Sequence, residues 1–64
     1  MLDSGRYERF QRNIIWFHHE FKSAEDHTPR SIEVQDVFSM VILNPTETRI
    51  DRFNQVCRDY RMEA

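Results

Sequence analysis

The chain has 64 residues, of which 39% are hydrophobic and 31% are charged, and its formal net charge is −2. This length permits one domain, residues 1–64, and a chain of this size buries only roughly 60% of its unfolded surface, which leaves little stability to spare. The composition excludes a disordered tail, and the absence of a basic excess argues against a dedicated DNA-binding domain.

The first predicted helix covers residues 4–24. Apolar side chains recur in it at spacings of three and four, a pattern that is typical of a helix facing another helix. Asp3 is its predicted N-cap, because Leu2 and Tyr7 stand at the positions of a hydrophobic staple around it. The apolar series is Tyr7, Phe10, Ile14, Phe17, Phe21 and Ala24.

Four large apolar residues in a row, from Ile14 to Phe17, interrupt the amphipathic pattern of this helix. At about 100° per residue, four consecutive side chains point to four different sides. One flat neighbour cannot cover them all. Ile15 and Trp16 therefore remain outside the series, and we expect a second chain to cover them.

The second predicted helix covers residues 29–43. Thr28 and Pro29 are typical of a helix start, with threonine as N-cap and proline at the first helical position. A strand is the alternative for this segment because it is rich in β-branched residues, although no second strand is available to pair with it. The expected core face is Val34, Val37, Phe38, Val41 and Ile42, and Ile32, Met40 and Leu43 lie elsewhere around the helix.

The third predicted helix covers residues 45–62, with Asn44 as cap, Pro45 at the first position and Glu47 at the third. Acidic residues lie near its start and basic residues near its end, which suits the helix dipole. The proline requires the second helix to stop or bend, and a continuous helix with a proline kink stays open. Its apolar face is Thr46, Ile50, Phe53, Cys57 and Tyr60, with Val56 beside them.

These elements predict an all-α, small three-helix domain, a helical hairpin plus a third helix. We expect the apolar faces of the first and third helices to pack against each other and the second helix to close the third side. The large apolar residues left over predict an exposed interaction surface and a homodimer. This predicted partner surface consists of Ile15, Trp16, Met40 and Leu43, with Arg12 and His19 at its polar rim.

Motifs for catalysis or for metal and cofactor binding are missing from the sequence. His18 and His19 are adjacent on a helix, whereas helical metal ligands need spacings of three or four residues. The serines lack a Gly-x-Ser-x-Gly context, and the single glycine, Gly5, cannot build a phosphate-binding loop. We therefore predict a non-enzymatic protein with no metal or cofactor.

A helix-turn-helix that binds nucleic acid is the main alternative, with the third helix as the recognition helix. The almost absent turn lacks the usual glycine, and acidic residues alternate with the basic ones, which counts against this alternative. Its nucleic-acid-binding residues would be Arg49, Arg52, Arg58 and Arg61.

The expected location is the cytoplasm. Cys57 is the single cysteine, so no disulfide can form within one chain, and a helical cysteine on an apolar face is typical of a core residue in a reducing compartment. No apolar run has the length of a signal peptide core or of a membrane span, so we expect a soluble protein without membrane contact.

Two continuous segments resemble a family of small phage proteins. They are NIIWFHHEF at residues 13–21 and NPTETRIDRF at residues 44–53. With the short length, they resemble a small early protein of lambdoid phages from the region between the exonuclease and excisionase genes. The resemblance implies expression in the cytoplasm of an infected bacterium, a part in phage development or in redirecting host processes, and a host protein as a possible partner. No site residues transfer with it.

Overall fold

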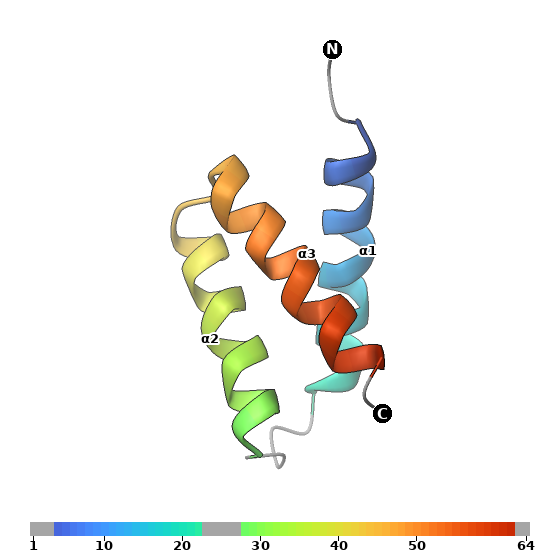
Figure 1. The fold of residues 1–64 in the computed structure, drawn as a ribbon, viewed down its shortest axis with the longest axis vertical. Coiled ribbons are helices and arrows are strands. Elements are labelled where there is room, and N and C mark those ends of the chain that lie inside the picture. Colours follow the sequence, from blue (N-terminus) through green and yellow to red (C-terminus); the bar gives the residue numbers. More distant parts are fainter. Residues whose placement is uncertain (1–3, 23–27, 63–64) are drawn as a thin grey trace.

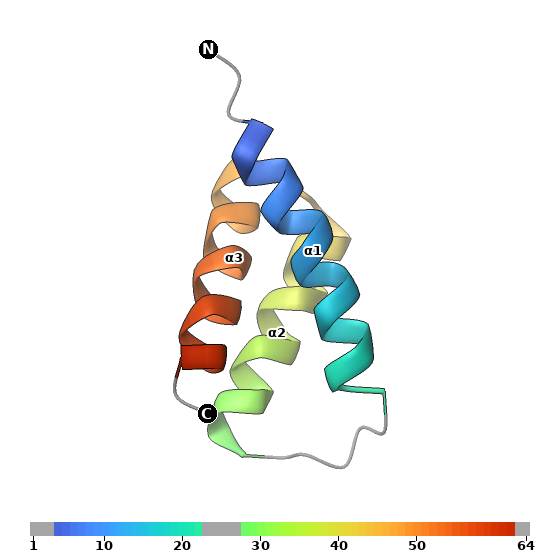
Figure 2. The same cartoon turned by 90° about the vertical axis from the view of Figure 1, so that its right-hand side faces the viewer.

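The computed structural model describes residues 4–22 and 28–62 of the chain. It contains three helices in these ranges, α1 (Ser4–Glu20), α2 (Pro29–Leu43) and α3 (Glu47–Met62). α3 packs against both α1 and α2 and crosses between them in Figure 1, and Figure 2 shows α1 in front of α2 and inclined to it. The predicted all-α, three-helix architecture is confirmed, and the strand alternative for the second element is wrong.

The start of α2 follows the prediction. The Thr28 hydroxyl oxygen accepts a hydrogen bond from the backbone N–H of Ser31 at 3.2 Å, and Pro29 occupies the first turn. The buried Ser31 hydroxyl donates to the Thr28 carbonyl at 3.0 Å. Thr28 thus satisfies backbone groups that lack a partner at a helix start, and this favours helix over strand for the segment that follows.

The corner between α2 and α3 differs from the prediction in its capping residue. Asn44 has an extended backbone (φ −153°, ψ 91°), and its N–H bonds to the Met40 carbonyl, which closes α2. Thr46 caps α3 instead, because its hydroxyl oxygen accepts from the N–H of Arg49 at 3.2 Å. Pro45 keeps Asn44 out of the helical region, so α2 ends before Asn44. Because Thr46 is the cap, α3 begins at Glu47 rather than at residue 45. α2 and α3 are separate helices, not one kinked helix.

The predicted first helix, residues 4–24, is longer than α1. α1 ends at Glu20, although the N–H of Phe21 still bonds to the Phe17 carbonyl at 2.9 Å and residues 21–22 form a turn. The proposed cap Asp3, its staple residue Leu2 and the last apolar position Ala24 lie outside the described residues.

The core is centred on one aromatic ring of α3. Phe53 is fully buried, and its ring centroid lies 5.8 Å from that of Phe10 and 6.3 Å from that of Phe17, both in α1. The ring of Phe38 in α2 lies 5.7 Å from Phe53 and stacks on Phe17 at 4.0 Å. These contacts confirm that the apolar faces of the first and third helices meet, and they connect α2 to both.

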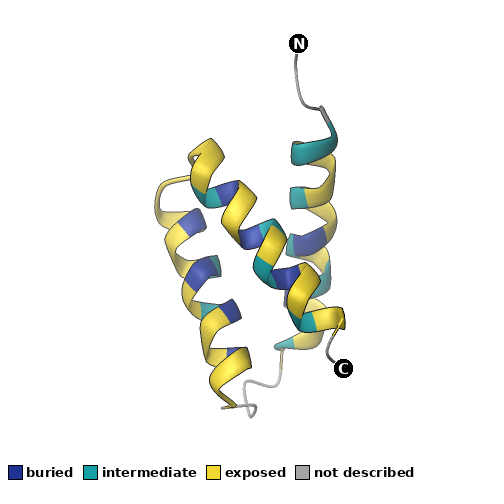
Figure 3. Cartoon of the chain, in the orientation of Figure 1, coloured by how far each residue is buried: buried dark blue, intermediate teal, exposed yellow. Residues whose placement is uncertain are grey.

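The remaining core positions largely match the predicted faces. The prediction was wrong for Tyr7 and Ile42, which were expected on the core faces and are both exposed. Tyr7 lies near the start of α1 and Ile42 in the last turn of α2, where the neighbouring helices do not cover them. Figure 3 shows the buried positions on the sides of the helices that face one another. The buried apolar residues are Phe17, Val34, Val37, Val41, Ile50, Phe53 and Cys57.

Replacing Phe53 with alanine should unfold most of the protein. The substitution removes a fully buried ring and costs about 3–5 kcal/mol, which is comparable with the whole stability of a domain this small. Thermal unfolding followed by circular dichroism measures the effect. Tyr7→Ala, at an exposed position, is the control and should keep its midpoint close to that of the unchanged protein; an equal loss in both variants would contradict the assignment of the core.

Candidate functional site

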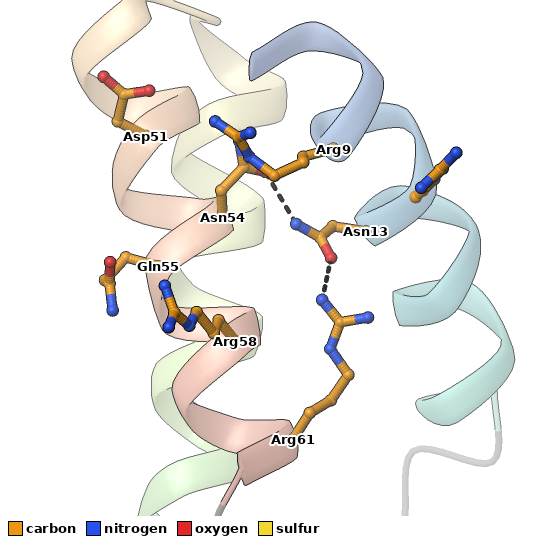
Figure 4. Close-up of a pocket in the computed structure, with 8 residues that line it drawn as sticks. Arg9, Asn13, Asp51, Asn54, Gln55, Arg58 and Arg61 are labelled. Carbon is orange, nitrogen blue, oxygen red and sulfur yellow. Dashed lines mark hydrogen bonds between the residues drawn. The ribbon is translucent and has the colours of Figure 1, made fainter. Parts of the chain in front are cut away.

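The contact between α1 and α3 contains a buried polar network. The side chain of Asn13 is only 3% exposed, and its Nδ2 donates to Oδ1 of Asn54 at 2.8 Å. Nδ2 of Asn54 donates in turn to the backbone carbonyl of Arg6 at 3.2 Å, and the guanidinium of Arg61 donates to Oδ1 of Asn13. Figure 4 shows the Asn13–Asn54 and Asn13–Arg61 bonds as dashed lines. The amide groups of this network are therefore hydrogen-bonded although they lie inside the domain.

An ion pair holds the first turns of α1 and α3 together. Arg6 Nε donates to Oδ1 of Asp51 at 2.7 Å, and a second guanidinium nitrogen donates to Oδ2 at 3.2 Å. A third contact joins Arg6 to Glu47 at 3.5 Å. A guanidinium bound by both carboxylate oxygens has a fixed orientation, so this pair adds geometric definition as well as attraction.

Trp16, which was expected on an exposed partner surface, lies near the other end of the contact between α1 and α3. Its ring packs against Tyr60 at a centroid distance of 5.6 Å and against Phe21 at 6.0 Å. The Arg61 guanidinium lies 5.0 Å from the ring centroid, within the range of a cation–π contact. Trp16 is therefore half-buried against α3 and is not the centre of an exposed surface.

The predicted partner surface is not gathered in one place. The Met40 carbonyl accepts a bond from Arg49, near the start of α3, whereas Trp16 contacts Tyr60 and Arg61 near its end. At 1.5 Å per residue these two points are roughly 16 Å apart along α3. Ile15 is 70% exposed on α1. Its helical neighbours are the polar residues Gln11, Arg12, His18 and His19.

α2 carries the largest group of exposed apolar side chains on a single helix in the described part of the chain. Ile32 is 52% and Leu43 is 79% exposed, and these residues are eleven positions apart, which is about three helical turns. They consequently point in nearly the same direction, with Asp36 and Ser39 between them. We call the surface centred on Ile32 and Leu43 the outer face of α2; Met40 and Ile42 are also exposed and flank it, each roughly 80° from Ile32 on opposite sides.

The four arginines of the nucleic-acid alternative divide between two sides of α3. Arg49 donates to the carbonyls of Met40 and Asn44 at 3.1 Å and 3.4 Å, and so caps the end of α2, which has no basic residue in its own last turn. Arg52 lines a small hollow on the α2 side of α3, together with Met40. Arg58 and Arg61 lie on the α1 side. The order of two helices and a tight corner matches a helix-turn-helix, but these arginines do not line one face.

A larger hollow lies between α1 and α3, and residues of the polar network form part of its lining (Figure 4). It has a volume of about 690 Å³. Among the described residues, its lining includes four arginines and a single carboxylate, Asp51. We call it the arginine hollow. The arginines are Arg9, Arg12, Arg58 and Arg61.

This hollow was not predicted from the sequence, because Arg12 was assigned to the rim of an apolar surface and Arg58 and Arg61 to a nucleic-acid-binding face. The sequence does contain a pattern that indicates it, a spacing of seven residues between polar side chains. Arg6 and Asn13 are seven positions apart in α1, and Glu47, Asn54 and Arg61 follow at the same spacing in α3. A polar heptad spacing on two helices indicates a shared polar stripe beside the apolar one.

The Cys57 thiol and the His18 ring both pack against other side chains of the domain. Cys57 is fully buried, and this burial raises the pKa of its thiol from 9.0 to about 12, against the opposing charge of Arg61. The thiol is therefore protonated at neutral pH. The ring of His18 packs against Phe38 at 5.5 Å. Within residues 4–22 and 28–62, no group of three or more His, Cys, Asp or Glu residues is placed to hold a metal ion.

No helix in the described ranges is both long enough and apolar enough to cross a membrane. Comparison with known proteins adds no further information: no protein-family model, curated protein or solved structure matches the chain.

The Asn13–Asn54 bond should show measurable coupling. Asn13→Ala and Asn54→Ala should each lower the free energy of unfolding by about 1–3 kcal/mol, because the first leaves the half-buried Oδ1 of Asn54 without its donor and the second leaves the buried Nδ2 of Asn13 without its acceptor. The double variant should lose less than the sum of the two, by about 1 kcal/mol. Urea unfolding of all four proteins measures this difference. The exposed Gln55→Ala is the control and should change stability by less than about 0.5 kcal/mol; strictly additive losses would mean that the two amides do not interact.

Proposed function

We propose that the protein is a non-enzymatic interaction module that associates with a second copy of itself through the outer face of α2. The observation that carries this proposal is the exposure of four large apolar side chains on one 15-residue helix. Clusters of exposed apolar side chains on small soluble proteins are typical of interaction sites. A chain of this size also has reason to gain stability from a partner, since its own core is small.

The spacing of Ile32 and Leu43 suits a two-fold symmetric contact. If two α2 helices pack antiparallel about an axis between Asp36 and Ser39, Ile32 lies against Leu43 of the partner subunit, and symmetry repeats the pair. Ser39 is small, and its hydroxyl is already bonded to the Gln35 carbonyl at 3.0 Å, so it permits a close approach near the axis. The two ends of such an interface are apolar and its middle is polar.

The free energy available from this contact is sizeable for a small interface. Full burial of an isoleucine or leucine side chain contributes about 1.5–3 kcal/mol, and much of that remains to be gained at Ile32 and most of it at Leu43. Association costs several kcal/mol of lost translational and rotational freedom. We therefore expect a dimer whose population depends on protein concentration.

The setting of this association follows from the resemblance alone. A self-associating module in an infected bacterium would act in phage development or in redirecting host processes, and a host protein is the alternative occupant of the outer face. The helix-turn-helix alternative has less support, since Arg49 is engaged at the end of α2 and is separated from Arg58 and Arg61.

Leu43→Asp and Ile32→Asp should each shift the solution mass from dimer to monomer, because each places a charge in the apolar end of the contact. Sedimentation across a dilution series, in the presence of reductant, measures the mass. Ile15→Asp is a matched control, as it makes the same change at an equally exposed position on α1, and should leave the dimer intact.

Two results would contradict the proposal. One is a monomeric mass of the unchanged protein at every concentration tested. The other is a dimer that Ile15→Asp dissociates and Leu43→Asp does not, which would assign self-association to α1. Circular dichroism of each variant establishes that the helices are retained.

A further inference from the structure

The arginine hollow concentrates positive charge in a protein whose net charge is negative. Four arginines and one aspartate give the described residues of its lining a formal charge of +3, whereas the whole chain carries −2. These arginines come from two helices that a buried amide network holds together. The charge is therefore placed by the fold and not by a flexible basic tail.

Carboxylates of the protein neutralise only part of this charge. Asp51 is bound by Arg6, and Arg12 pairs with Glu8 at 2.8 Å. Arg61 is held by neutral groups, the Asn13 side chain and the Trp16 ring. Arg9 and Arg58 have no hydrogen-bond or ion-pair partner among the described residues. Three guanidinium groups, those of Arg9, Arg58 and Arg61, thus border the hollow without a carboxylate partner.

The arrangement of these three groups suits an anion with several oxygens. Figure 4 shows them around the Asn13–Asn54 pair, with Arg9 on α1 and Arg58 and Arg61 on α3. Guanidinium groups present planar pairs of N–H donors, which match phosphate and carboxylate oxygens. Arg61 is already oriented by its contacts with α1, so little further ordering is needed for it to bind a ligand.

The surroundings of the hollow favour a small anion over a long one. Asp51 at its lining and Glu47 and Asp59 elsewhere on α3 would repel the continuous phosphate backbone of a nucleic acid. None of the described residues that line the hollow is aromatic, so bases would lack a stacking surface on them. A volume of about 690 Å³ accommodates a ligand of one or two phosphate groups with its substituent.

We propose that the arginine hollow binds a compact phosphate group, a phosphate monoester or diphosphate, through Arg9, Arg58 and Arg61. This site is separate from the outer face of α2 and does not require the protein to be a dimer. Arg61 provides the oriented donor, and Arg9 and Arg58 close on the ligand from the two helices. The affinity falls as salt concentration rises, because the site is open to solvent.

Titration with sodium pyrophosphate at low ionic strength tests the proposal, with the side-chain Nε–Hε resonances of the arginines followed by NMR. We expect saturable shifts at Arg9, Arg58 and Arg61, and a loss of affinity of about tenfold in Arg9→Gln and in Arg58→Gln, since each removes a charge-assisted hydrogen bond. Arg52→Gln is the matched control on the other side of α3 and should bind as the unchanged protein does. Leu43→Asp should also bind pyrophosphate, which separates this result from the test of self-association.

Further titrations distinguish the source of the phosphate. Tighter binding of ADP than of pyrophosphate would identify a nucleotide, and tighter binding of a phosphoserine peptide would identify a modified protein; both support the site. Absence of saturable shifts, or an equal loss of affinity in Arg52→Gln, would overturn it. So would tighter binding of duplex DNA or of a glutamate-rich peptide than of any compact phosphate.

Discussion

The register between two parallel helices is the constraint on which the rest of the structure depends. Arg6 meets Glu47 and Asp51 near the starts of α1 and α3, and Asn13, seven residues after Arg6, meets Asn54, seven residues after Glu47. Because Asn13 is buried, sliding α1 by one residue along α3 would leave its amide without a partner, at a cost of about 1–3 kcal/mol. Apolar side chains alone tolerate such shifts more easily. The amide pair therefore sets which residues of α1 face which residues of α3.

The two sides of α3 differ in chemistry, and this difference produces the two surfaces with functional interest. On the side of α3 that faces the core, Phe53 contacts aromatic rings of both α1 and α2. On the side of α3 that contacts α1, the polar network of Asn13, Asn54 and Arg61 lies at the helix contact, and the arginine hollow lies beside it. Since α2 packs into the core with Val34, Val37, Phe38 and Val41, its other large apolar residues remain outside, and these are Ile32, Met40, Ile42 and Leu43. These two surfaces are the proposed self-association contact and the proposed anion site.

The sequence predicted the three helices well because apolar spacing of three and four residues has few other solutions, and Thr28–Pro29 specifies a helix start. It predicted the capping of α3 less well, since Asn44 and Thr46 are both acceptable caps and the hydrogen bond of Asn44 to α2 appears only in three dimensions. The role of Asn13 was missed because a single polar residue beside an apolar series is ordinarily exposed. Trp16 was misplaced because its large ring reaches sideways to Tyr60, a contact that depends on the register of two distant segments.

The side-chain amide of Asn13 offers the most direct test of this account. In NMR spectra of the unchanged protein, its Nδ2 protons should exchange slowly with solvent and show nuclear Overhauser effects to Asn54 in α3, because the amide is buried and donates across the helix contact. Rapid exchange with effects only to residues of α1 would contradict the account. In that case neither the parallel register nor the placement of the arginine hollow would stand.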